Sequence, residues 1–373
     1  MKTIFFMCSG LGKTPRGFEA HVEDLFHNIN CLGLYNVHLY KGGGITNKNE
    51  KRIKHIPQTS NVAKLLSFIS GKTTYFIQNV TFFIGLLPYV TFIKIDCIYL
   101  GEPILCNLLI KWRKITGQRF RILFFTGGQT IPRCIDKHDF IHHVSPLCIE
   151  RAIELGIPSS HQFLIPHFLN LTSEHLVLND SNKRRLKKNL NIPDYAKIIL
   201  SVGAIDYSVK RMDYIIREVS KIKQPVFLIL LGTEEKQTNE VKVLAKTLLG
   251  DNNIYINSVP RNQLSQYYNI ADVFVLASLM EGFGIVFIEA LSHGIPVVAH
   301  DYSVSRYVLN THGNFTDLSI DNSLISAVEA IIGNENTFKE KQLRHRFVYD
   351  NYSWNSLKSS YLLMFEKVTK IAD

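Results

Sequence analysis

Short runs of apolar, β-branched and aromatic residues alternate along this chain with longer segments in which apolar residues recur every three or four positions. The short runs predict strands in the first half at 3–8, 37–40, 74–77, 97–100 and 122–125. In the second half they predict strands at 197–202, 226–231, 253–256, 273–276 and 296–299. The periodic segments predict helices at 19–30, 105–116, 211–221, 239–249, 261–269 and 285–293. Buried strands that alternate with helices are typical of parallel sheets covered on both faces.

This alternation occurs twice, on either side of a looser segment at residues 165–170. We therefore predict an α/β protein with two doubly wound (Rossmann-like) parallel-sheet domains, residues 1–170 and 171–355. Ligands of such sheets bind outside the carboxyl ends of the strands, so we expect a site that faces a cleft between the domains. The basic run at 183–188 lacks interleaved aromatic residues, which favours a solvated helix face over nucleic-acid contact.

Composition adds an asymmetry of charge. The 373 residues are 46% hydrophobic and 20% charged, as is ordinary for a globular protein. The formal net charge is +10; residues 1–170 carry 19 Lys and Arg against 10 Asp and Glu, and the remainder carries 23 against 22. The excess therefore points to a partner of the first half. Basic clusters at 51–54 and 111–121 flank apolar segments, so our hypothesis is an anionic membrane surface, and a generically basic surface is the alternative.

Neither a secretory signal nor a membrane span is predicted. Residues 1–10 have one Lys, a short apolar run and no small-residue cleavage site, which favours a buried first strand entering a Gly-rich turn. Residues 73–93 are uncharged, but Gln78, Asn79 and Pro88 lie among them, which favours a strand followed by a buried helix. Six scattered cysteines without a C-x-x-C pair predict reduced thiols in a cytoplasmic protein.

The segment 277–291 carries the most specific pattern. Gly282, Phe283 and Gly284 lie between a predicted strand and a predicted helix, where glycines allow a tight turn whose amide groups attract anions and hydroxyl oxygens. Glu281 stands on the turn and Glu289 stands eight positions later, up to ~12 Å away along the helix. Two carboxylates at this spacing suit the hydroxyls of two sugar rings joined by a diphosphate. The alternative is that Glu281 only favours the helix start and Glu289 pairs with a neighbouring cation.

This segment resembles the donor-binding signature of the group 1 (family 4) glycosyltransferases, retaining enzymes of the GT-B fold. Other parts of that signature follow in the expected order, at 200–203 with 210–213, 228–232, 298–301 with 306–309, and 352–354. The resemblance is specific over residues 197–360. It also implies a final helix, residues 356–373, that crosses back to the first domain.

Carried over by position, the resemblance implies a donor site. Glu289 would bind the ribose hydroxyls, and Glu281 with the amides of Phe283 and Gly284 would hold the transferred hexose. Lys210, helped by Arg211, would sit on the diphosphate, where a cation offsets the charge that grows on the departing group; an exposed loop cation is the alternative for Lys210. The implied donor-binding residues are Gly203, Lys210, Arg211, Gly232, Glu281, Gly282, Phe283, Gly284 and Glu289, with Glu281 and Lys210 as the catalytic residues.

One position departs from the family's pattern. Ala204 stands where the family usually has Arg, directly after the glycine that ends the strand. The diphosphate clamp would then depend on Lys210, and a catalytically degenerate sugar-binding protein stays open as an alternative.

Two glycine-containing loops in the first half are candidates for the acceptor and phosphate side. Gly12 and Gly17 follow the first strand in a loop that resembles one which closes on donor phosphate and acceptor, and an ordinary strand-to-helix turn explains them equally well. Gly127 and Gly128 end another predicted strand at a point where many family members carry a His. The nearby histidines, His138, His142 and His143, are interpreted as structural or exposed.

The function predicted from these observations is transfer of a hexose, with retention, from a nucleotide-diphosphate sugar to a glycan or lipid-linked acceptor in polysaccharide or glycoconjugate synthesis. We expect no metal or other cofactor, because the chain has no D-x-D motif and no Cys/His cluster, and no nucleic-acid partner. No Asp or Glu stands out as a nucleophile, so the resemblance implies front-face retention with the leaving phosphate as base. A nucleotide-sugar epimerase is the other enzyme considered. The expected location is the cytoplasm, peripheral on the inner face of the membrane.

Overall fold

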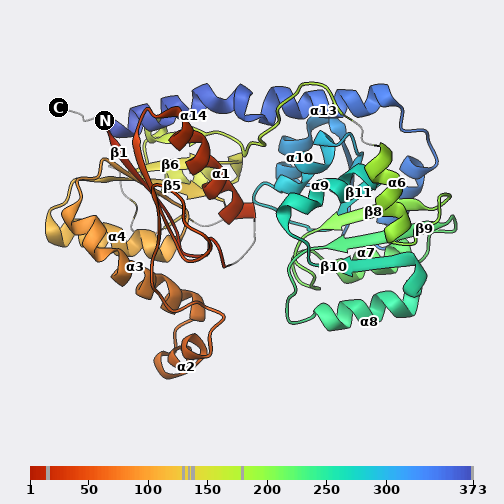
Figure 1. Cartoon of the computed structure of the whole chain (residues 1–373), viewed down its shortest axis with the longest axis horizontal. Coiled ribbons are helices and arrows are strands. Elements are labelled where there is room, and N and C mark those ends of the chain that lie inside the picture. Colours follow the sequence, from red (N-terminus) through yellow and green to blue (C-terminus); the bar gives the residue numbers. More distant parts are fainter. Residues whose placement is uncertain (14–16, 128–130, 133–134, 136–138, 178–179, 371–373) are drawn as a thin grey trace. The chain divides into compact units, whose positions relative to one another are not determined.

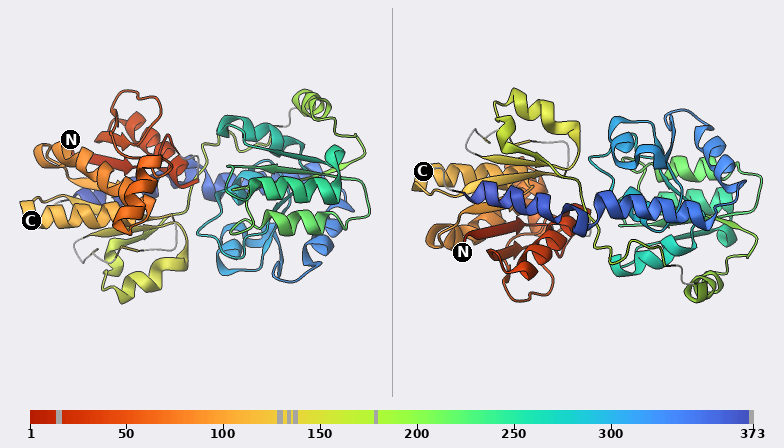
Figure 2. Two further views of the ribbon diagram at one scale, coloured as in Figure 1. Left: turned by 90° about the horizontal axis from the view of Figure 1, so that it is seen from below. Right: turned by 90° about the horizontal axis from the view of Figure 1, so that it is seen from above.

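The computed structural model describes residues 1–13, 17–127, 131–132, 135, 139–177 and 180–370. The chain divides into two compact units (Figure 1). Unit 1 comprises Met1–His167 with Lys358–Asp373, and unit 2 comprises Phe168–Leu357. Within each unit, helices cover both faces of a sheet (Figure 2).

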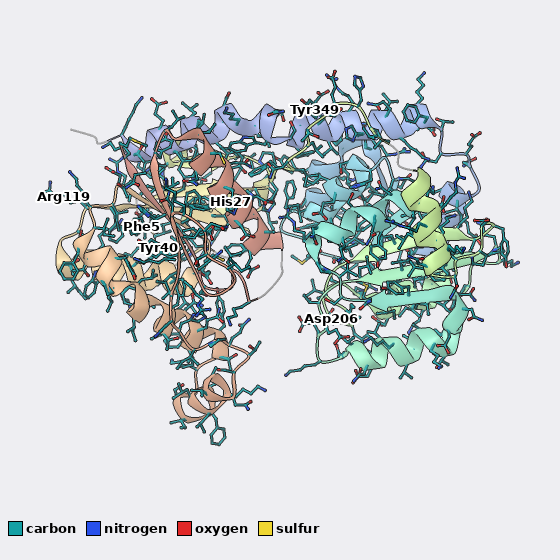
Figure 3. The ribbon with its side chains drawn as sticks, in the orientation of Figure 1. Phe5, His27, Tyr40, Arg119, Asp206 and Tyr349 are labelled. Atoms are coloured by element: carbon teal, nitrogen blue, oxygen red, sulfur yellow. The ribbon has the colours of Figure 1, made fainter. Side chains whose placement is uncertain are left out.

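Unit 1 is built on a parallel sheet with the strand order β3-β2-β1-β4-β5-β6-β7. Its strands are β1 (Thr3–Cys8), β2 (Asn36–Lys41), β3 (Glu50–Arg52), β4 (Cys97–Leu100), β5 (Arg121–Thr126), β6 (Phe140–His143) and β7 (Gln162–Leu164). Its helices are α1 (Gly17–Leu32), α2 (Asn61–Ser70), α3 (Thr74–Phe92), α4 (Pro103–Thr116) and α5 (Ile149–Glu154). All of β1 is buried between β2 and β4, and the Phe5 ring packs 4.7 Å from that of Tyr40 (Figure 3).

Unit 2 repeats this architecture with the strand order β10-β9-β8-β11-β12-β13. Its strands are β8 (Lys197–Val202), β9 (Val226–Leu231), β10 (Ile254–Asn257), β11 (Val273–Leu276), β12 (Val297–His300) and β13 (Gly313–Thr316). Its helices are α6 (Asp180–Asn189), α7 (Met212–Val219), α8 (Thr238–Leu249), α9 (Arg261–Ile270), α10 (Ile285–Ser292), α11 (Ser303–Leu309), α12 (Ser323–Ile332) and α13 (Phe338–Tyr352). The prediction of two doubly wound, parallel-sheet α/β domains is confirmed.

The last helix, α14 (Trp354–Thr369), begins in unit 2 and continues into unit 1. Within unit 1 the Phe365 ring lies 5.8 Å from that of Phe6 on the central strand. The Tyr361 hydroxyl donates a hydrogen bond to the Pro166 carbonyl (2.8 Å). The predicted helix that returns to the first domain is therefore confirmed.

The predicted strand at 74–77 is wrong, because this segment is the first turn of α3. The Thr73 hydroxyl caps that helix by accepting a hydrogen bond from the Phe76 amide (3.1 Å). Aromatic and β-branched residues suggested a strand, but buried Phe82, Leu86 and Val90 continue at helical spacing into the core of unit 1. By length and composition α3 could cross a membrane. One face of this helix, however, packs into the core of unit 1.

Candidate functional site

Two glycines bring the carboxyl ends of β8 and β9 into direct contact. A Cβ atom on Gly232 would lie 1.6 Å from the Gly203 carbonyl oxygen, so no other residue fits at position 232 without moving the backbone. A Cβ on Gly203 would lie 3.0 Å from Cγ and Cδ of Lys210. The aliphatic part of Lys210 therefore lies across Gly203, and the glycines allow its ammonium group to reach over this edge of the sheet.

Lys210 and Glu281 meet at that edge, although they are far apart in sequence. The Lys210 Nζ atom lies 2.5 Å from Glu281 Oε1, and the two side chains keep 20% and 14% of their surface exposed. The pair is thus partly buried and still reachable by a ligand. An ammonium group in this position can exchange its carboxylate partner for a phosphate oxygen, and the released carboxylate can accept hydroxyl groups.

The turn that follows Glu281 has the predicted form. Gly284 has φ 77° at the start of α10, in the left-handed region, and a Cβ there would lie 2.6 Å from the Phe287 ring. Phe283 is buried, with its ring 5.9 Å from that of Tyr352. The turn is therefore anchored by one aromatic side chain and depends on glycine at its last position.

Glu289 is supported by a residue that the sequence did not reveal. The buried Tyr268 hydroxyl on α9 donates a hydrogen bond to Glu289 Oε2 (2.9 Å). Burial, followed by the negative charge of Glu289, raises the pKa of Tyr268 well above its usual value, so the phenol remains a donor. The Tyr268 ring stacks on His293, whose pKa is lowered by burial. No local pattern links Tyr268 to Glu289, because they lie on different helices.

Arg211 makes contacts within unit 2 that differ from the diphosphate contact expected of it. Its backbone is left-handed (φ 50°), and its Nη1 donates a hydrogen bond to the Leu318 carbonyl (2.7 Å). Its guanidinium lies 4.3 Å from the centre of the Tyr214 ring. These contacts join the loop before α7 to the segment after β13. The predicted help from Arg211 at the diphosphate stays a prediction.

The glycines predicted in unit 1 lie in close-packed turns. A Cβ on Gly12 would lie 2.3 Å from the carbonyl carbon of Gly43, and one on Gly127 would lie 2.7 Å from the Phe18 ring. Gly17 is the first residue of α1. Gly128 and His138 lie outside the described residues. The roles of these glycines in acceptor or phosphate binding are predictions.

His142 and His143 are buried in β6, in agreement with a structural role. His142 Nδ1 lies 3.0 Å from the Tyr99 hydroxyl, and its Nε2 lies 2.8 Å from the Ile165 carbonyl. Burial lowers the pKa of His142 to about 3 and that of His143 to about 4, so both rings are neutral at pH 7.

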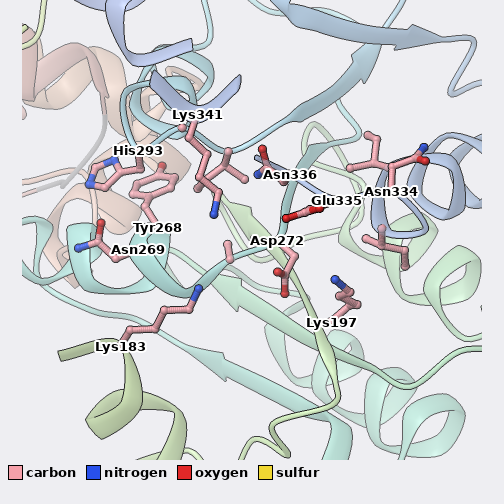
Figure 4. A pocket seen from close by; sticks show the side chains of 15 residues that line it. Lys183, Lys197, Tyr268, Asn269, Asp272, His293, Asn334, Glu335, Asn336 and Lys341 are labelled. Carbon is pink, nitrogen blue, oxygen red and sulfur yellow. The ribbon is translucent and has the colours of Figure 1, made fainter. Parts of the chain in front are cut away.

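A cavity of about 270 Å³ lies at the opposite edge of the unit 2 sheet (Figure 4). Lys197, the first residue of β8, and Asp272, just before β11, line it together with Lys183 and Lys341. It is therefore at the amino ends of the strands, whereas ligands of doubly wound sheets bind at the carboxyl ends. Among the residues described, no group of three or more His, Cys, Asp or Glu side chains could hold a metal ion.

Comparison with known proteins identifies the domain that carries the Lys210–Glu281 pair. Residues 182–354 match the family described as glycosyl transferases group 1. This part of the chain belongs to that family. The matched residues include Lys210, Glu281 and Glu289, so the site described above lies within a group 1 glycosyltransferase domain.

Curated relatives are similar over part of their length. The chain is 25% identical over 253 residues to the alpha-galactosylglucosyldiacylglycerol synthase of Streptococcus pneumoniae, covering 66% of this chain and 67% of the relative. It is 27% identical over 170 residues to the alpha-monoglucosyldiacylglycerol synthase of the same organism, covering 43% and 38%. An uncharacterised glycosyltransferase of Haemophilus influenzae is 31% identical over 163 residues, covering 42% and 45%. The chain thus spans less than half the length of the last two.

Solved structures share the fold over nearly the whole chain. The sucrose-phosphate synthase of Thermosynechococcus elongatus superposes with a TM-score of 0.78 at 17% identity, covering 99% of each chain. The Anabaena protein HepE, solved in complex with UDP and glucose, superposes with a TM-score of 0.76 at 14% identity, covering 98% of this chain and 100% of that one. The GT-B fold implied by the sequence resemblance is confirmed.

Proposed function

We propose that this chain transfers a hexose from a nucleotide-diphosphate sugar to a glycan or lipid-linked acceptor, with retention of configuration at the anomeric carbon. The observation that carries the proposal is the accessible Lys210–Glu281 pair, 2.5 Å apart at the carboxyl edge of a parallel sheet and inside the family-matched residues. The solved neighbour HepE, named in complex with UDP and glucose, supports a nucleotide sugar as the donor.

Donor binding would separate the Lys210–Glu281 pair. The Lys210 ammonium group would move from the carboxylate to the diphosphate, and Glu281 would accept hydrogen bonds from hexose hydroxyls. Glu289, oriented by the Tyr268 hydroxyl, would accept hydrogen bonds from the ribose. The ion pair thus holds the ammonium group and the carboxylate in place before the donor arrives. The donor must then replace this ion pair with its own contacts.

The reaction needs one bond to break and one to form at the anomeric carbon. The bond from that carbon to the diphosphate oxygen breaks, and the acceptor hydroxyl oxygen forms a new bond on the same face. The acceptor proton passes to the departing phosphate oxygen, which acts as the base. Negative charge grows on the diphosphate during this step, and Lys210 stabilises it there without a metal ion.

We assign the acceptor to unit 1, near the two segments that carry Gly12, Gly17 and Gly127; the first of these resembles a family loop that closes on donor phosphate and acceptor. Two relatives are named as diacylglycerol glycoside synthases, which supports a lipid-linked acceptor. Such an acceptor would place the enzyme in the cytoplasm, on the inner face of the membrane.

A thermal-shift panel of UDP-, GDP-, ADP- and dTDP-sugars tests the donor site. The correct donor at 100 times its Kd should raise the free energy of unfolding by ~2.7 kcal/mol. Lys210→Ala should lower turnover about 100- to 1,000-fold. The matched control is Lys221→Ala. Lys221 also forms an ion pair, with Glu218 of α7 (2.8 Å), but lies outside the proposed site, so its loss should leave turnover unchanged.

Five outcomes would overturn parts of this proposal. If no nucleotide sugar shifts unfolding, the donor site is wrong. A donor that binds without transfer to glycan or lipid acceptors would identify a sugar-binding protein, and conversion of the donor without an acceptor would identify an epimerase. NMR of the product should show the donor's anomeric configuration; the opposite configuration would exclude retention. Excess EDTA should leave turnover unchanged. Loss of turnover in EDTA would exclude a metal-independent reaction.

A further inference from the structure

Helix α2 exposes a continuous face of large apolar side chains. Val62, Leu65, Phe68 and Ile69 are 55%, 59%, 89% and 71% exposed. With 3.6 residues per turn, these four fall within an arc of about 120°, on the side opposite Ala63, the residue through which the helix is buried. Four adjacent exposed apolar residues of this size mark a surface that binds a partner.

This face belongs to a well-formed helix rather than a loose loop. The Ser60 hydroxyl accepts a hydrogen bond from the Ala63 amide (3.1 Å) at one end, and Gly71, with φ 65°, ends the helix at the other. The Ser67 hydroxyl donates to the Lys72 carbonyl (2.5 Å) and ties the helix to the turn before α3. In Figure 1, α2 lies beyond α3, away from the sheet of unit 1.

The charge around this helix identifies the kind of partner. Residues 51–95 contain six Lys and Arg and no Asp or Glu. Exposed Lys64 on α2 and exposed Lys72 in the following turn flank the apolar face. A helix with apolar side chains on one face and lysines at the borders of that face suits the interface of a bilayer that contains anionic lipid. Acyl chains cover the apolar side chains, and lipid phosphates attract the lysines.

We propose that α2 is a docking helix for an anionic membrane. Val62, Leu65, Phe68 and Ile69 enter the boundary between headgroups and acyl chains, and Lys64 and Lys72 contact lipid phosphates. The neighbouring α3 does not span the bilayer, since Phe82, Leu86 and Val90 hold it in the core of unit 1. The inference deepens the proposed function, on which it rests for the lipid-linked acceptor, by naming the surface that reaches the lipid.

Vesicle flotation of the full chain tests this docking helix. The wild type should float with vesicles of phosphatidylcholine and phosphatidylglycerol, and much less with phosphatidylcholine alone. Phe68→Ser should weaken binding about tenfold or more, and Lys64→Gln about fivefold, on the anionic vesicles only. The matched control is Val243→Ser on α8 of unit 2, a helical position of similar exposure (66%), which should leave binding unchanged. Far-UV circular dichroism establishes that each variant is folded.

Depth of insertion gives a second measurement. Phe68→Trp should be quenched by lipids brominated on their acyl chains, whereas Val243→Trp should not. Three results would overturn the proposal. The first is a wild type that does not float with anionic vesicles, and the second is equal weakening of vesicle binding by Phe68→Ser and Val243→Ser. The third is a dimer in solution that Phe68→Ser converts to a monomer, which would identify a second copy of the chain as the occupant of this face. Lost flotation with an intact donor-induced thermal shift counts against the docking helix alone. Intact flotation without any donor shift counts against the proposed function alone.

Discussion

At the scale of single residues, the hydrogen bond from the Tyr268 hydroxyl to Glu289 can be removed without changing the rest of the side chain. Tyr268→Phe keeps the ring stacked on His293 and removes only the hydroxyl that donates to Glu289 Oε2. Because a hydrogen bond to a charged group contributes about 1.5–3 kcal/mol, we expect KM for the donor to rise about 10- to 150-fold. The proposed role of Glu289 is at the ribose, away from the reacting atoms, so kcat should change less.

Steady-state kinetics against donor concentration measure this split. The control is Tyr267→Phe on the same helix, whose hydroxyl lies 3.4 Å from that of Tyr255 and should not affect the donor. If both variants raise KM equally, or if Tyr268→Phe lowers kcat alone, Tyr268 does not orient a ribose-binding carboxylate.

Not every residue of the site was accessible to prediction. Glu281 and Glu289 were, because both lie on one stretch of strand, turn and helix whose spacing has a direct geometric meaning. Lys210 required the resemblance to a family. Arg211 was grouped with Lys210 as its neighbour in sequence, yet its left-handed backbone directs the guanidinium to the Leu318 carbonyl. Adjacent positions in a loop can serve different parts of the fold, and a sequence does not show which.

At the scale of elements, α3 lies close against the segment after β3. A Cβ on Gly85 would lie 2.5 Å from Ile53 Cγ2 and 3.0 Å from the Lys54 carbonyl oxygen. Gly85→Ala should gain about 1 kcal/mol of helix propensity and lose about 1–3 kcal/mol to overpacking. The backbone oxygen cannot move as a side chain can, so we expect a net destabilisation of unit 1.

Urea unfolding followed by the fluorescence of Trp112, in unit 1, measures this change in a Trp354→Phe background. Ile84→Ala, at an exposed position of the same helix, should stay within about 0.5 kcal/mol of its parent. A rise in stability on Gly85→Ala would mean that α3 is not packed in this way.

Element prediction succeeded where strands are central and apolar, as at β1, β8, β9 and β11, because burial on both faces leaves a continuous hydrophobic run. It failed where a strand lacks such a run. β3 is three residues of Glu, Lys and Arg at the edge of its sheet, and β6, between β5 and β7, ends in two histidines. The same absence of polar residues that identifies buried strands led to the wrong strand at the start of α3.

At the scale of the whole molecule, positive charge and proposed chemistry belong to different units. The excess of Lys and Arg lies in residues 1–170, which form nearly all of unit 1, whereas the Lys210–Glu281 pair belongs to unit 2. The sequence pointed to an anionic partner for the first half but placed the contact at basic clusters. The fold adds the exposed apolar face of α2, which depends on burial and is not visible in composition.

The two units should also differ in their response to acid. Burial lowers the pKa of His142, His143 and His167 in unit 1 to about 3, 4 and 3. The unfolded chain binds these protons near pH 6.5 and the folded unit does not, so the stabilisation is complete above pH 6.5 and is lost as the pH falls towards 4. Between pH 7 and 5 each histidine should cost about 2 kcal/mol, which is large against a typical domain stability of about 5–15 kcal/mol.

The two tryptophans make this acid response measurable in each unit separately. Trp112 reports on unit 1 in a Trp354→Phe background, and Trp354 reports on unit 2 in a Trp112→Phe background. We expect the urea midpoint of unit 1 to fall much further between pH 7 and 5 than that of unit 2. His142→Gln should remove about a third of the unit 1 pH dependence, and His312→Gln, half-buried in unit 2, should leave it unchanged. Equal shifts of both midpoints would mean that the buried histidines of β6 and its neighbours are not what makes unit 1 sensitive to acid.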